Sequence, residues 1–159
     1  LVARITPMVH DAYEHLAGTA TPIELTYEPG WRQLGLVAAL QAVRETDVRR
    51  GVSTVGPHRD ELSFSINGLP SRTHASQGEQ RTLALALRLA AHQLVTERTG
   101  TAPVLVLDDV LSELDDGRAT ALLEHIPPGQ VIITTATELP SAAKADRILR
   151  VEAGKVSEG

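Results

Sequence analysis

The chain has 159 residues, which is enough for one domain with a substantial core, and 42% of them are hydrophobic. It contains no cysteine, which excludes a disulfide framework and a thiolate metal site, and its six histidines show no metal-ligand spacing. The formal net charge of −5 is opposite in sign to that of most nucleic-acid binders, so composition alone does not indicate DNA binding.

The first third of the chain predicts a helix, a strand and a second helix. Apolar residues recur at three- and four-residue steps from Val2 to Leu16, and Thr21–Tyr27 alternates like an edge strand. Gln33–Arg49 has the pattern of a helix that stops at Gly51. The only local concentration of positive charge lies here, in Arg44, Arg49, Arg50 and Arg59. Cations at a helix end explain it about as well as a DNA-facing patch does.

Short strands precede the longest predicted helix. Val52–Val55 predicts a short strand, and a Gly-Pro turn then opens the segment Gly56–Asp60. Apolar residues alternate with serines over Leu62–Ile66 as far as Asn67-Gly68, which is the strongest short hairpin signal. Leu69–His74 then returns toward the helix.

The next helix has apolar residues at helical spacing and begins at Ser76 with a capping box. In such a box Ser76 accepts a hydrogen bond from the Glu79 amide, while the Glu79 side chain reaches back; many ordinary helices begin this way. Gly78 is not needed for the box, and glycine in a helix costs up to about 1 kcal/mol relative to alanine. A bare backbone there would let an anion approach the free amides at the positive end of the helix dipole.

A run of four apolar residues, Val104–Leu107, predicts a strand buried on both faces of a parallel sheet. Asp108 and Asp109 follow at its carboxyl end, which is where open α/β sheets bind their ligands. Two carboxylates in tandem at that place suggest a Mg²⁺ holder followed by a water-activating base, as in nucleotide hydrolysis. A polar loop that caps a core strand is the alternative explanation.

The remaining residues continue the alternation of helix and strand. The predicted elements are a helix over Asp116–Ile126, a buried strand over Val131–Thr135, a short helix over Ser141–Asp146, and a hairpin of Ile148–Val151 with Lys155–Val156. From Ser76 onward, this order is typical of half of an α/β sheet.

Three motifs in this order resemble those of ABC-type ATPases. Ser76-Gln77-Gly78-Glu79 resembles the signature motif, Val104–Asp109 the Walker B strand, and Ser112-Glu113-Leu114-Asp115 the D-loop. Together with the segments Gly56–Leu62 and Gly78–Ala90, these three motifs are most similar to the RecF family of bacterial DNA replication and repair proteins, which have an SMC-like ATPase head. The resemblance implies an α/β fold, namely the C-terminal half of an ABC/SMC-like P-loop ATPase head: a mixed sheet with flanking helices. Residues 1–50 would be the end of a helical arm domain, and residues 51–159 the C-terminal lobe of the head.

The resemblance also implies a role for each motif residue in a homodimer whose two heads enclose ATP. Asp108 would hold Mg²⁺, mostly through water, and Asp109 would orient the attacking water. The signature would cap the ATP held by the other subunit, the D-loop would lie at the dimer seam, and Thr135 would take the place of a switch histidine. The residues implied to bind the cofactor are Ser76, Gln77, Gly78, Glu79, Ser112, Asp115 and Thr135.

The sequence departs from the ABC pattern at several places. A Walker A loop, Gly-x-x-x-x-Gly-Lys-Ser/Thr, occurs nowhere in these residues, and Glu79 stands where the signature usually has glutamine. Asp109 is followed by Val110, whereas ABC transporters have glutamate and then proline after the Walker B aspartate. This difference favours the RecF-like branch.

The family implies a weak ATPase that acts as a dimer on gapped DNA or single-strand/duplex junctions, in replication, recombination, repair and the SOS response. A RecR-like recombination mediator would be a partner, and residues 1–159 alone would be inactive. Because Arg88 interrupts the most apolar helix and no signal peptide is present, we expect a cytoplasmic protein without a membrane partner. Two alternatives stay open: a nucleotide-free module that binds DNA or a partner, and half of another SMC-like or ABC ATPase.

Overall fold

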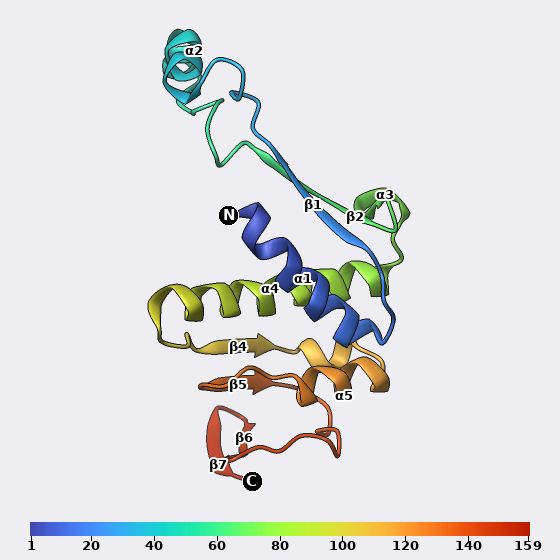
Figure 1. Ribbon diagram of the computed structural model, residues 1–159. Helices are drawn as coiled ribbons and strands as arrows, with labels where there is room; N and C mark the ends of the chain where they lie inside the picture. Colours follow the sequence, from blue (N-terminus) through green and yellow to red (C-terminus); the bar gives the residue numbers. More distant parts are fainter.

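The computed structural model describes residues 1–159, in which a packed body lies between a long two-stranded ribbon at one end and a C-terminal hairpin at the other (Figure 1). The helices are α1 (Val2–Ala17), α2 (Leu36–Arg50), α3 (Ser71–His74), α4 (Gln77–Thr99), α5 (Asp116–Glu124) and the 3-10 turn η1 (Val110–Glu113). The strands are β1 (Ile23–Glu28), β2 (Glu61–Ile66), β3 (Leu69–Pro70), β4 (Leu105–Asp108), β5 (Val131–Thr134), β6 (Leu149–Glu152) and β7 (Lys155–Glu158).

The core lies where α1 crosses α4 above the β4–β5 pair (Figure 1). The apolar stripe predicted for α1 is confirmed, because its buried residues are Ile5, Val9, Tyr13 and Leu16. On α4, the small side chains of Ala86 and Ala90 are fully buried, which lets the two helices approach closely. This crossing fixes α4, and with it the turn at Ser76 that begins α4.

Strands β4 and β5 are parallel, and their register places Asp108 opposite Thr134. Leu105 and Leu107 are buried in the core. The prediction that this strand is buried on both faces is wrong for this chain, because Val104 and Val106 remain 53% and 58% exposed. In a strand, alternate side chains point to opposite faces, and here only one of the two faces is covered.

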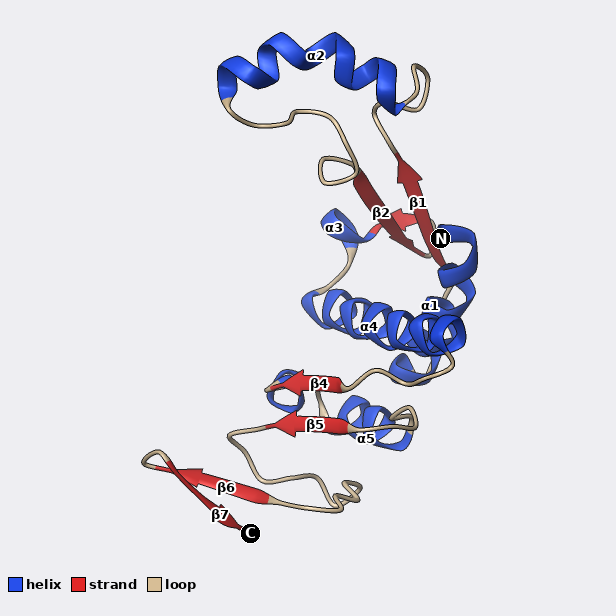
Figure 2. Cartoon of the chain, turned by 90° about the vertical axis from the view of Figure 1, so that its left-hand side faces the viewer, coloured by secondary structure: helices blue, strands red, loops and turns tan.

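Strands β1 and β2 form the antiparallel ribbon, paired from Ile23 opposite Ile66 to Glu28 opposite Glu61. Helix α2 lies at its far end, away from α4 in both views (Figures 1 and 2), and Ala39 is its only buried residue. The predicted hairpin turn at Asn67-Gly68 is confirmed, and both residues have the positive φ that such a turn requires. The return strand is short, since β3 ends at Pro70 and α3 follows.

The strand predicted over Val52–Val55 is wrong. Both the backbone amide and the hydroxyl of Thr54 donate to the Asp47 carboxylate, at 3.0 and 2.6 Å, and the Val52 amide donates to the Asp47 carbonyl at 3.3 Å. The segment is therefore folded back on the end of α2, where no neighbouring strand is available to pair with it.

The helix predicted over Ser141–Asp146 is also wrong. Only a single turn forms, in which the Ala143 amide donates to the Pro140 carbonyl at 2.9 Å. So short a helix needs a buried apolar face to be stable, and this segment has none. The C-terminal hairpin of β6 and β7 is confirmed. None of the helices combines the length and the apolar character that a membrane crossing requires.

Candidate nucleotide site

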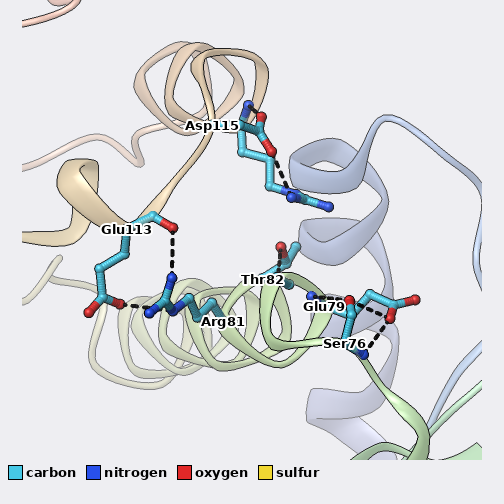
Figure 3. Close-up of polar contacts among 8 residues, drawn as sticks. Ser76, Glu79, Arg81, Thr82, Glu113 and Asp115 are labelled. Atoms are coloured by element: carbon cyan, nitrogen blue, oxygen red, sulfur yellow. Dashed lines mark hydrogen bonds and ion pairs between the residues drawn. The ribbon is translucent and has the colours of Figure 1, made fainter.

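The capping box predicted at the start of α4 is present in full (Figure 3). The Ser76 hydroxyl accepts from the Glu79 amide at 3.2 Å and donates to Glu79 Oε2 at 2.7 Å, while the Ser76 amide donates to the same oxygen at 2.8 Å. These hydrogen bonds, together with the nearby Arg118 charge, lower the pKa of the Glu79 carboxyl group. The Glu79 carboxylate therefore already accepts hydrogen bonds from Ser76. Gln77, by contrast, is exposed and its side chain makes no hydrogen bond.

The bare backbone at Gly78 lies beside the guanidinium group of Arg118. A Cβ added at Gly78 would lie 3.3 Å from Arg118 Nη1, and the Gly78 carbonyl accepts a 2.8 Å hydrogen bond from the buried Thr82 hydroxyl. In this structure, the room that glycine leaves is thus next to a cation of the same chain. Sequence reasoning missed Arg118, although its position three residues after Asp115 in a helix favours an ion pair between them.

The predicted D-loop segment contacts α4 through Arg81, and its last residue, Asp115, caps α5. Asp115 caps α5 by accepting from the Arg118 amide at 2.9 Å, and it pairs with Arg118 Nη1 at 2.7 Å. The hydrogen bond from the Arg118 amide and the Arg118 charge lower the pKa of the Asp115 carboxyl group. On α4, Arg81 Nε lies 3.5 Å from the Glu113 carboxylate, and Arg81 Nη1 donates to the Glu113 carbonyl at 3.4 Å (Figure 3).

The tandem carboxylates lie at the carboxyl end of β4, as predicted, and both are exposed. The Thr134 hydroxyl donates to the Asp108 carboxylate. The Asp109 amide donates to both the carbonyl and the hydroxyl oxygen of Thr134, at 3.1 Å each. The Asp109 carboxylate makes no hydrogen bond within the chain, and the Asp109 carbonyl accepts from the Ser112 hydroxyl at 2.8 Å.

Thr135 lies just beyond β5, and its hydroxyl contacts Thr137 at 3.0 Å rather than either aspartate. Thr134, which the sequence analysis did not single out, is the threonine that contacts Asp108. The register of a parallel pair could have indicated it, because residues opposite one another at the ends of two strands share a sheet edge.

The site residues fall into two groups. Ser76, Gly78 and Glu79 lie at the start of α4 beside Arg118, which pairs with Asp115. Asp108 and Asp109 contact Thr134, and Ser112 contacts the Asp109 carbonyl. We call residues Ser76–Glu79 the signature turn, after the motif that they resemble. No hydrogen bond or ion pair joins this turn to Asp108 or Asp109. The oxygen ligands at the end of β4 fit Mg²⁺, which binds proteins through one or two carboxylates and takes its other ligands from water and phosphate. No cluster of three acidic, histidine or cysteine side chains is present that could hold a metal by itself.

The chain is similar to known proteins in both sequence and structure. The DNA replication and repair protein RecF of Rippkaea orientalis is 37% identical over 169 residues, covering 98% of this chain and 44% of that protein. Two solved structures of the recombination mediator protein RecF in the RecFOR pathway, one of them RecF-ATP, superpose with TM-scores of 0.71 and 0.69 at 29% identity, over 98% of this chain and 44% and 43% of theirs.

The chain matches the C-terminal part of RecF. It spans less than half the length of the RecF proteins it matches. The head of an Smc protein bound to the C-terminal winged-helix domain of ScpA also superposes, with a TM-score of 0.61 over 99% of this chain and 42% of that one. At 19% identity this likeness concerns the fold alone, and it confirms the predicted ABC-type α/β architecture. No protein-family model matches the chain.

Proposed function

We propose that residues 1–159 act as the C-terminal portion of a RecF-like DNA replication and repair ATPase. In it, ATP and Mg²⁺ bind between the heads of a homodimer. Residues 51–159 would supply the C-terminal lobe of each head, and residues 1–50 the end of the arm. The observation that carries the proposal is the Asp109 carboxylate, which is exposed at the ligand-binding end of a parallel strand and has no partner within the chain.

The two groups of site residues have complementary chemistry in such a dimer. Asp108 would hold Mg²⁺, which neutralises charge on phosphate oxygens when bound. Asp109, with both carboxylate oxygens free, would orient a water molecule and accept its proton. Ser76, Gln77 and the amides near Gly78 would meet the phosphate chain on the opposing subunit, because the start of α4 carries unpaired amides and positive dipole charge. The separation of the two groups in one chain supports this division between subunits.

The partners follow from the relatives. A relative solved as RecF-ATP belongs to the RecFOR pathway, which supports ATP as the cofactor and a RecR-like mediator as a partner. DNA, at gaps or single-strand/duplex junctions in the cytoplasm, would be the substrate on which the dimer assembles. Ser112 and Asp115 would lie at the dimer seam, and Thr135 near the nucleotide.

ATP-driven dimerisation of the complete protein tests the proposal. Ser76→Arg places a bulky cation where the opposing phosphate must dock, so ATP should still bind to single heads while the dimer is lost. Ser63→Arg is the matched control, since Ser63 is also exposed but lies on the ribbon. Light-scattering mass with and without ATP gives the answer. If Ser76→Arg dimerises as fully as Ser63→Arg, Ser76 is only a helix cap.

A nucleotide-free DNA-binding module is the second candidate, and one observation favours it. The segment 29–60 holds five arginines and three acidic residues, and none of these arginines pairs with a carboxylate. Asp47 and Asp60 are instead engaged by Thr54, Tyr27 and Trp31. DNA binding by the complete protein that is equal with and without ATP would favour this module over the ATPase.

A further inference from the structure

We propose that Thr134 is a positioning residue that holds both tandem carboxylates in place at the end of β4. This inference rests on the proposed function of Asp108 and Asp109. Nothing in the resemblance to the ABC signature, Walker B or D-loop motifs identifies Thr134; its contacts in the structure do.

The Thr134 hydroxyl makes two hydrogen bonds of opposite direction. It donates its proton to the Asp108 carboxylate and accepts from the Asp109 amide at 3.1 Å. A hydroxyl has one donor and two acceptor positions, so both bonds form at once and each fixes the direction of the other. The orientation of the Asp108 carboxylate is thereby coupled to the backbone of Asp109.

The backbone at Asp109 needs such support. Its φ is 50°, in the left-handed region that residues other than glycine rarely adopt. The Asp109 amide finds two acceptors on Thr134, the hydroxyl and the carbonyl oxygen, and the Ser112 hydroxyl holds the Asp109 carbonyl. All of these hydrogen bonds involve the backbone of Asp109. The residue is therefore held in place while its carboxylate stays available to a water molecule.

The register of the sheet explains why position 134 serves this role. Thr134 is the last residue of β5 and lies opposite Asp108, so the two side chains leave the same edge on the same face. Thr135, one residue further, has left the strand and turns its hydroxyl to Thr137. A β-branched threonine also has few rotamers in a strand, which keeps its hydroxyl on the Asp108 carboxylate.

The test replaces the hydroxyl without changing the shape of the side chain. In the complete protein, Thr134→Val should lower ATP turnover by about 10–100-fold, because small displacements of positioned catalytic groups have effects of this order. The KM for ATP should stay within about twofold, since the phosphate-docking residues are untouched. Thr134→Ser, which restores the hydroxyl, should recover most of the turnover. Thr26→Val is the control, because Thr26 is an exposed strand threonine without a side-chain hydrogen bond.

A second measurement needs no nucleotide. In the free protein, hydrogen exchange of the Asp109 amide should be faster in Thr134→Val than in the parent protein or in Thr134→Ser, because one of its two acceptors is gone. If Thr134→Val does not fold, Thr134→Ala is measured with the same expectations.

The outcomes separate this inference from the proposed function. Suppose that Thr134→Val keeps the ATP turnover and the Asp109 amide exchange rate of the parent protein, while Asp109→Asn loses most of its turnover. This result would overturn the role of Thr134 alone. Parental turnover in both variants would overturn the proposed function itself. A loss of turnover that Thr134→Ser does not recover would also overturn the role of the hydroxyl.

Discussion

Asp109 combines an uncommon backbone conformation with a free carboxylate, and the two properties can be separated by substitution. Asparagine tolerates the left-handed region about as well as aspartate, so Asp109→Asn keeps the backbone and removes the charge. We expect normal ATP binding and a turnover lower by about 10²–10⁴-fold, the range for loss of a general base. Dimers formed with ATP should also persist longer, because in the proposed function hydrolysis would release them. Steady-state ATPase measurements decide the matter, and unchanged turnover would exclude this role of Asp109.

Glu79 makes the stability of the signature turn dependent on pH. Its folded-state pKa is lowered, first by the Ser76 hydrogen bonds, so its contribution is present above the ordinary glutamate pKa of about 4.3. That contribution is lost as the pH falls through the lowered folded-state value. Glu79→Gln keeps a capping side chain without the charge. The parent should therefore exceed the variant in unfolding temperature near pH 7, and this difference should shrink below about pH 4. A difference independent of pH would contradict the assignment.

The start of α4 contacts α5 at Gly78. This contact predicts that Gly78→Ala has different effects on the stability of the fold and on dimerisation. Alanine gains up to about 1 kcal/mol of helix propensity over glycine, and the only close neighbour of its new Cβ is the flexible Arg118 side chain. The variant should unfold at the same or a slightly higher temperature. It should nevertheless dimerise less with ATP, because Arg118 is displaced from the signature turn. Full dimerisation would show that this guanidinium does not need to lie at Gly78.

The elements also show which features a sequence can reveal. The capping box at Ser76, the turn at Asn67-Gly68 and the end of α2 at Gly51 depend on neighbouring residues only, and all three were predicted correctly. Val52–Val55 and Ser141–Asp146 were predicted from local pattern, but a strand needs a neighbouring strand and a short helix needs a buried apolar face, and the fold gives these segments neither.

The candidate site also combines features set by neighbouring residues with features that depend on the rest of the fold. The tandem aspartates could be predicted from the sequence because they directly follow an apolar run. The contacts of Arg118 with Gly78 and of Thr134 with Asp108 join segments more than twenty residues apart. Only the packing of α4, α5 and the two parallel strands brings these segments together, so no local pattern could have shown either contact.

For the whole molecule, the exposed face of the β4–β5 pair predicts how residues 1–159 behave alone. Val104, Val106 and Ile132 are exposed there, and a two-stranded sheet offers open edges that invite pairing with another chain. We expect this polypeptide to self-associate. Without a phosphate-binding loop and its lysine, the negative carboxylates at the end of β4 should give no measurable ATP binding. Light-scattering mass tests the first statement and calorimetry with Mg²⁺-ATP tests the second; a micromolar isotherm from a monodisperse sample would contradict both.

The ribbon of β1 and β2 joins α2 to the core and can transmit a force between them. Its far end carries α2 (Figure 2). Its near end is anchored in the core by Ile23 and Ile66, and near α2 the side chains of Tyr27 and Trp31 both donate to Asp60. Only nine residues lie between Ile66 and Ser76, and the Gln80 side chain ties that connection to α4 by donating to the Ser71 and Ala75 carbonyls. A load that tilts α2 would therefore exert its torque close to the start of α4, so in the proposed dimer a force on α2 would reach the nucleotide interface through β2 and α3.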